Sequence, residues 1–191
     1  MKQQVARYVF EKLLRWHITT TFPDVDKSII VVAPHTSICD AILGKLVLLS
    51  YGLTHKILSK ESLFVFPFGY IMQWFGSIPV RKNDSQTCRQ LIKLLKENDR
   101  MHLVICPEGT RHATNRWNMG FCAIAKLTGT PVFAVYIDYQ ERGIGVKGQV
   151  SVKDKQTATA DLINYYQHTK AKNPSDFILP VLPMKEKNES I

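Results

Sequence analysis

The sequence lacks the patterns that build metal centres and disulfide frameworks. Its 191 residues hold four cysteines, and no two of them have the Cys-x-x-Cys spacing of a zinc site or a redox motif. We therefore expect reduced thiols and no bound metal. Acidic residues are also scarce, because 16 Asp and Glu stand against 25 Lys and Arg, a formal net charge of +9. This excess favours an anionic partner: nucleic acid, an acidic membrane surface, a phosphorylated substrate or an acidic carrier protein.

Long hydrophobic runs are missing as well. The longest stretch without a charged residue is Ser62–Val80, which has 19 residues and is interrupted by two prolines and two glycines. A helix that spans a bilayer needs about 20 apolar residues without such breaks. We therefore expect a buried or interfacial segment here. A mean hydropathy of -0.10 with 45% hydrophobic residues fits a globular domain and excludes a polytopic membrane protein or a disordered chain.

The sequence does contain apolar strands that alternate with amphipathic helices. Continuous apolar runs predict buried strands at 28–33, 101–106 and 132–137. Shorter runs predict two more strands, at 56–59 and 77–80. Apolar periodicity predicts helices over 37–50, 84–98, 117–127 and 157–170, and alternation over 143–153 predicts a late hairpin. This order indicates an α/β layered domain with a largely parallel central sheet flanked by helices.

The first residues predict an amphipathic helix with a basic flank. Val5, Val9, Leu13 and Trp16 recur at spacings of three and four, with cationic residues on the other faces. Two interpretations remain open at this point. The helix either packs on its own domain or docks on a membrane interface, where Trp16 and the cations would contribute to binding.

A histidine and an aspartate follow the first predicted buried strand. His35 comes directly after Pro34, and Asp40 follows five residues later. Because positions i and i+5 lie about 140° apart on a helix, His35 must precede the next helix and Asp40 must lie in its first turns. The carboxylate can then fix the imidazole so that it acts as a general base. The alternatives are a structural His–Asp pair, or a Cys–His nucleophile with Cys39, which we instead expect to pack in the core.

Two charged clusters also follow predicted strands. After the strand at 101–106 come four residues, Glu108, Gly109, Thr110 and Arg111, in which the glycine permits a tight turn and the guanidinium can hold a phosphate or carboxylate. The alternative is a loop ion pair. After the strand at 77–80 come Arg81 and Lys82, which form a phosphate site only if the other loops converge on them.

Together these motifs resemble the glycerolipid acyltransferases typified by lysophosphatidic acid acyltransferase. His35 and Asp40 match the H-x-x-x-x-D signature, and 107–111 matches the second hallmark, Pro-Glu-Gly-Thr-Arg. With the segments 76–80 and 130–132, the resemblance covers about 29–137 and looks most like the small, single-domain bacterial members. It implies a glycerolipid-acyltransferase-like layered fold. From this resemblance and the residue patterns together, we expect an N-terminal amphipathic helix (1–22), an acyltransferase domain (23–184) and a mobile tail (185–191).

The resemblance also implies a reaction. A fatty acyl group would pass from acyl-CoA or acyl carrier protein to the hydroxyl of a lysophospholipid, with lysophosphatidic acid as the leading acceptor. His35 would be the general base and Asp40 would orient it, without a covalent intermediate and without a cofactor besides the acyl donor. The residues that would bind the acceptor are Glu108, Gly109, Thr110 and Arg111, together with Arg81 or Lys82.

Two departures from the family pattern leave the acceptor open. Lys82 stands where the third family block usually ends in an arginine, and Ala134 stands where the fourth often has a second proline. Acylation of another lysolipid, in lysophospholipid remodelling or on an amino-acid lipid, shares every motif. A non-catalytic, basic lipid-binding protein is the alternative of a different class. We expect peripheral association with the cytoplasmic membrane face through anionic lipid and no nucleic-acid binding, since no platform of interleaved aromatic and cationic residues is evident.

Overall fold

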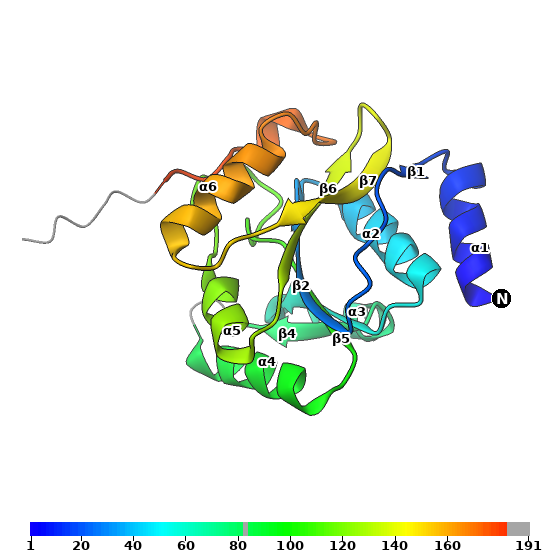
Figure 1. Cartoon of the computed structure of the whole chain (residues 1–191). Coiled ribbons are helices and arrows are strands. Elements are labelled where there is room, and N and C mark those ends of the chain that lie inside the picture. Colours follow the sequence, from blue (N-terminus) through cyan, green and yellow to red (C-terminus); the bar gives the residue numbers. More distant parts are fainter. Residues whose placement is uncertain (82–83, 183–191) are drawn as a thin grey trace, which may run out of the picture.

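The computed structural model describes residues 1–81 and 84–182, so Lys82 and the predicted tail at 185–191 lie outside the described residues. Its centre is a seven-stranded sheet in the order β1-β7-β6-β2-β5-β3-β4 (Figure 1). All neighbouring strands are parallel except β6 and β7. The strands are β1 (His17–Ile18), β2 (Lys27–Ala33), β3 (His55–Lys60), β4 (Ser77–Val80), β5 (Met101–Ile105), β6 (Val132–Asp138) and β7 (Gly143–Gln149).

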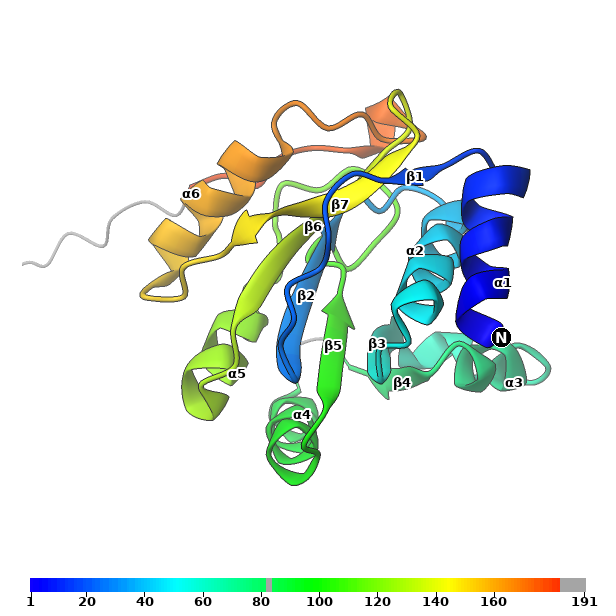
Figure 2. The same ribbon diagram turned by 45° about the vertical axis from the view of Figure 1, so that its right-hand side comes forward.

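Helices cover both faces of this sheet, which confirms the predicted fold class. In both views α1 and α2 lie on one side, and α4, α5 and α6 lie on the other (Figures 1 and 2). The helices are α1 (Lys2–Tyr8), α2 (Ile38–Tyr51), α3 (Phe68–Trp74), α4 (Ser85–Glu97), α5 (Gly120–Thr128) and α6 (Lys155–Tyr166). The described residues also form three short helical turns: η1 (Val9–Leu13), η2 (Glu61–Leu63) and η3 (Pro174–Asp176).

The central strand β2 is buried on both faces of the sheet by the two layers of helices. Ile29 and Val31 belong to the hydrophobic cluster that α4, α5 and α6 complete, whereas Ile30 packs with Leu48 of α2 in another cluster. Successive side chains of a strand point to opposite faces, so a strand buried on both sides reads as a continuous apolar run. Each fully buried side chain of this size contributes about 1.5–3 kcal/mol, and an aspartate in place of Val31 would break the core.

The N-terminal segment differs from the predicted helix over 1–22. Helical structure ends at Leu13, and Arg15 adopts a left-handed backbone conformation with a φ of 56°. The chain then forms β1, which pairs in parallel with β7 at the edge of the sheet. Trp16 is buried with Phe10 in the cluster on the α2 side, so it is part of the core and not a membrane anchor. Helical spacing misassigned Trp16 because its burial depends on contacts distant in sequence.

One smaller prediction is also wrong. The late hairpin over 143–153 is a single strand, β7, that pairs with β6, so the turn lies earlier, at 139–142. Gly148 marks a close approach instead of a turn, because a Cβ there would lie 2.6 Å from the Tyr165 hydroxyl. The helix predicted over 37–50 is present as α2, and its apolar residues Ile38 and Ile42 are exposed.

Most of the uncharged stretch 62–80 is exposed or half-buried, although Ser77 of β4 is buried. Phe66 is 85% exposed and Trp74 is 71% exposed. They belong to the exposed apolar segment, which we define as Leu63, Val65, Phe66, Phe68, Tyr70, Ile71 and Trp74. Within the described ranges, no helix has the length and apolar character needed to cross a membrane. Burial, one of the two predicted alternatives, is therefore wrong for most of this stretch.

Candidate active site

His35 lies at the carboxyl edge of the sheet, between the end of β2 and the start of α2. Its Nδ1 atom is 3.5 Å from Oδ2 of Asp40, so the structure brings the two predicted residues together. Its backbone N–H donates a hydrogen bond of 3.1 Å to Oε1 of Glu108. With Nδ1 directed at a carboxylate, Nε2 is the ring nitrogen that is free to take a proton from a substrate.

Asp40 is held on both carboxylate oxygens. It sits in the first turn of α2 and completes a capping box with Ser37, so it also satisfies the helix N-terminus. Oδ2 accepts hydrogen bonds of 2.8 Å from the backbone N–H groups of Thr36 and Ser37, and Oδ1 accepts one of 2.5 Å from the Tyr139 hydroxyl. Burial works to raise the pKa of Asp40, but hydrogen bonds from His35, Tyr139 and the Ser37 amide outweigh it and lower that pKa. The carboxylate is therefore ionised at neutral pH.

Glu108 follows β5 and lies beside the His35–Asp40 pair. Its Oε2 atom is buried and has no hydrogen-bond partner among the described residues. Burial raises the pKa of Glu108 to about 8, and the negative charge of Asp40 adds to this rise. The loop ion pair with Arg111 is not formed. At neutral pH the protonated form of Glu108 prevails, and its Oε2 can donate a hydrogen bond.

The rest of the second motif forms an exposed turn. Gly109 has a φ of 61°, a left-handed conformation that favours glycine. The Thr110 hydroxyl accepts a hydrogen bond of 3.3 Å from the backbone N–H of His112, and Arg111 is exposed to solvent. The turn thus places an exposed guanidinium three residues after the buried carboxyl of Glu108.

Arg81 does not join this group. It follows β4, which two strands, β5 and β3, separate from β2. Its guanidinium makes a bidentate ion pair with Glu61, at 2.6 and 2.9 Å, and both side chains are largely exposed. The structure therefore does not bring the predicted cations together at His35, and Lys82 lies outside the described residues.

Cys39 is neither a nucleophile paired with His35 nor a core residue. It is half-buried on α2, and its Sγ accepts a hydrogen bond of 2.9 Å from Nζ of Lys172. This contact, with a smaller contribution from Ser37, lowers the pKa of Cys39. The chain after α6 also braces the histidine loop, because Asn173 Nδ2 donates a hydrogen bond of 2.9 Å to the carbonyl of Thr36.

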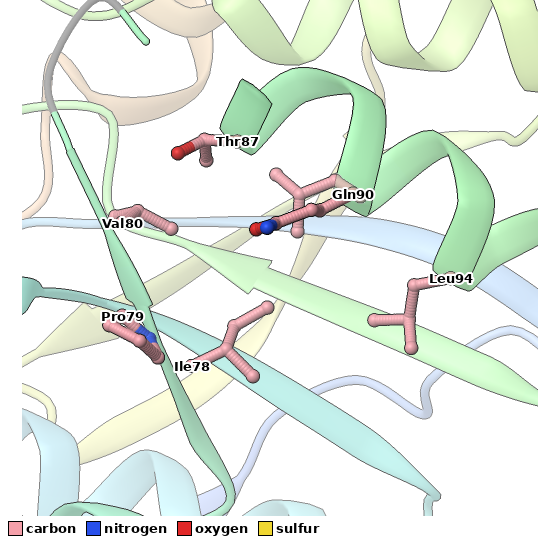
Figure 3. Close-up of a pocket in the computed structure, with 7 residues that line it drawn as sticks. Ile78, Pro79, Val80, Thr87, Gln90 and Leu94 are labelled. Atoms are coloured by element: carbon pink, nitrogen blue, oxygen red, sulfur yellow. The ribbon is translucent and has the colours of Figure 1, made fainter. Parts of the chain in front are cut away.

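An apolar groove lies between the sheet and the helices α4 and α5. Figure 3 shows one part of this groove, where Ile78 and Val80 of β4 face Leu94 of α4; its volume is about 220 Å³. A neighbouring part of about 360 Å³ shares Val80 and reaches the end of β5 at Ile105. Its lining residues are Leu58, Val80, Arg81, Asp84, Thr87, Cys88, Leu91, Ile105, Asn118, Gly120, Phe121 and Ile124.

Known proteins share both the sequence pattern and the fold. A family model described as acyltransferase matches residues 13–138. A chloroplast 1-acyl-sn-glycerol-3-phosphate acyltransferase of Brassica napus is 30% identical over 121 residues, which are 59% of this chain and 33% of that protein. A 1-acyl-sn-glycerol-3-phosphate acyltransferase of Streptococcus pneumoniae is 30% identical over 126 residues, 63% of this chain and 45% of that protein. The chain thus spans between a third and a half of these relatives.

A solved structure has the same fold. The crystal structure of the 1-acyl-sn-glycerophosphate acyltransferase PlsC from Thermotoga maritima superposes with a TM-score of 0.54 at 20% sequence identity. The superposition covers 79% of this chain and 68% of the other. At this identity the likeness establishes a common architecture.

Proposed function

Since the chain belongs to the acyltransferase family, we propose that it transfers a fatty acyl group from an acyl thioester to the hydroxyl of a lysophospholipid. Lysophosphatidic acid is the first acceptor to test, because the matched relatives are named as 1-acyl-sn-glycerol-3-phosphate acyltransferases. The observation that carries the proposal is the imidazole of His35 held against the buried carboxylate of Asp40 at the carboxyl edge of the sheet.

The proposed reaction is a direct transfer. Nε2 of His35 takes the proton of the acceptor hydroxyl as its oxygen attacks the thioester carbonyl. The new C–O bond forms, the C–S bond breaks, and the departing thiolate recovers the proton from the imidazolium. Asp40 keeps the Nδ1–H tautomer in place and stabilises the imidazolium while it exists.

We assign the phosphate of the acceptor to Arg111. It is exposed, and it follows Glu108, which touches the backbone of His35. A guanidinium binds phosphate with two parallel hydrogen bonds. Arg81 is engaged by Glu61, so it would have to exchange that carboxylate for a phosphate.

The acyl chain has an apolar site available. The groove beside β4 is lined by apolar residues such as Leu58, Leu91 and Ile124, and it extends to Ile105 at the carboxyl edge of the sheet. Ligand sites of this kind are concave and mostly apolar with a few polar groups. We place the fatty chain there, with its thioester toward His35. The donor is acyl-CoA or acyl carrier protein, and no other cofactor is needed.

A membrane surface is the proposed source of the acceptor. The exposed apolar segment carries aromatic side chains of the kind that sit at the interface between lipid and water. The formal net charge of +9 adds an attraction to anionic lipid. We therefore propose peripheral association with the cytoplasmic membrane face through this segment.

A thioester-release assay tests the reaction. The protein is incubated with acyl-CoA or acyl carrier protein and a panel of lysolipids that includes lysophosphatidic acid and neutral acceptors. We expect thiol release that depends on the acceptor and falls by about 10²–10⁴-fold in His35→Ala. His168→Ala, which changes an exposed histidine beyond α6, is the matched control. A folded His35→Ala protein with unchanged turnover would refute the mechanism, and no acceptor-dependent release from any pair would favour a non-catalytic lipid-binding protein.

A further inference from the structure

We propose that Tyr139 is a positioning residue for the catalytic pair, because its hydroxyl fixes the orientation of Asp40 and so the direction in which His35 is held. This inference rests on the proposed function for the reaction that it serves. Tyr139 lies 99 positions after Asp40 in the sequence and belongs to neither family motif. Its hydroxyl donates a 2.5 Å hydrogen bond to Oδ1, the carboxylate oxygen that faces away from His35.

The two carboxylate oxygens of Asp40 have different hydrogen-bond partners. Oδ2 faces His35 and accepts hydrogen bonds from the backbone N–H groups of Thr36 and Ser37. Among the described residues, Oδ1 accepts its hydrogen bond from the Tyr139 hydroxyl. A buried carboxylate oxygen that loses its donor bears the full cost of desolvation. Without the Tyr139 hydroxyl, the carboxylate is held by hydrogen bonds on Oδ2 alone among the described residues, so its orientation is less fixed and more of its negative charge acts on the imidazole of His35.

Tyr139 is itself held in place by contacts that do not involve Asp40. Its backbone N–H donates to the carbonyl of Lys170 at 2.9 Å, and the turn around it is closed by Asp138, which accepts the N–H groups of Gln140 and Glu141. Its ring meets Trp16 edge-on, with the ring centres 4.9 Å apart. The hydroxyl is thus presented by a preformed turn and not by a mobile side chain.

The hydrogen bond also tunes the proton affinity of the pair. A donor to Asp40 is strongest while the carboxylate carries its full charge, and it weakens when an imidazolium shares that charge. Tyr139 therefore disfavours protonation of the pair, and its loss shifts protonation to higher pH. The other titratable or charged groups around Asp40 remain in a Tyr139 variant: His35 before α2, Cys39 on α2, Cys106 and Glu108 after β5, and Lys172 after α6.

The test compares two variants that each lose a single hydroxyl. Tyr139→Phe keeps the ring against Trp16, and Tyr165→Phe removes a hydroxyl that bonds the carbonyl of Gln149 on the exposed side of α6. For Tyr139→Phe we expect kcat to fall about tenfold, the worth of a hydrogen bond to a charged group. The KM of the acceptor should stay unchanged, and the acid limb of kcat/KM should rise by about one pH unit. Tyr165→Phe should leave kcat, the KM of the acceptor and the acid limb of kcat/KM as in the wild type.

A second measurement keeps this test separate from the proposed function. Titration of the His35–Asp40 pair, followed by NMR through the imidazole signals without substrate, should move to higher pH in Tyr139→Phe only. If the wild type transfers no acyl group, the proposed function fails while this titration still decides whether Tyr139 acts on the pair. A uniform loss of activity at every pH, with neither the acid limb nor the titration moved, would show that Tyr139 only supports the fold and would overturn the inference.

Discussion

Glu108 should make the folded protein lose stability as the pH rises. An ordinary glutamate has a pKa of 4.5, and burial raises the pKa of Glu108 to about 8. Between these values the unfolded chain releases the proton while the folded chain keeps it. Stability falls with pH wherever the unfolded state binds fewer protons than the folded state. Glu108 therefore does not reduce the free energy of unfolding below the lower pKa, and it reduces that free energy by the full amount above the higher pKa. A difference of this size corresponds to at most about 5 kcal/mol, since each pKa unit is worth about 1.4 kcal/mol.

Glu108→Gln removes this penalty without changing the shape of the side chain. The amide cannot ionise, and it can still accept the hydrogen bond from the backbone N–H of His35. Urea unfolding followed by circular dichroism gives the free energy of unfolding of both proteins between about pH 5 and pH 9. We expect the variant to gain stability over the wild type as the pH rises, by at least about 2 kcal/mol across this range. Glu141→Gln, which changes an exposed carboxyl, is the control.

One result would refute this reasoning about Glu108. If the difference in unfolding free energy between wild type and Glu108→Gln is the same at every pH, then Glu108 ionises alike in both states. The carboxyl would then be solvated in the folded protein, and the site would hold two adjacent carboxylates, Glu108 and Asp40, at neutral pH.

Two further predictions concern the substrate and the membrane. Arg111→Ala should raise the KM for lysophosphatidic acid and leave a neutral acceptor unaffected, as steady-state kinetics would show; an equal loss with both acceptors would instead indicate a structural role. Replacing Phe66 and Trp74 with serine should reduce co-sedimentation with anionic vesicles, because both side chains are exposed and apolar. Leu127→Ser, at an exposed apolar site on α5, is the matched control, and equal binding by both variants would exclude the exposed apolar segment as the docking surface.

The sequence predicted those parts of the site that depend on local order. His35 and Asp40 are close in the chain, and the end of a buried strand followed by a helix start is enough to place one beside the other. Glu108 was predicted as a site residue, but its burial was not, because burial depends on the segments that pack over the loop. Tyr139 carries no local signal at all. Its contact with Asp40 exists only because β6 and β2 are neighbours in the sheet.

The same distinction explains the errors in the fold. Helical spacing correctly predicted an amphipathic start, yet it assigned Trp16 to that helix although the side chain is buried with Ile144 of β7. Alternation over 143–153 correctly predicts extended structure, but it does not identify the partner strand, which is β6 and not a second half within this segment. The contact of Trp16 joins segments that are remote in sequence, which no local pattern encodes, whereas β6 and β7 are consecutive strands and only the position of their turn, at 139–142, was missed.

The two edges of the sheet have a consequence for how copies of this protein can associate. One edge is β1, which has only two residues, and the other is β4, which contains Pro79 and so lacks a backbone donor at that position. A long, regular edge is a template on which a second chain can add a strand and start a fibril. Here the template is too short on one side and interrupted on the other. Self-association at high concentration should therefore proceed through side-chain contacts that detergent disperses, and not through cross-β growth that detergent leaves intact.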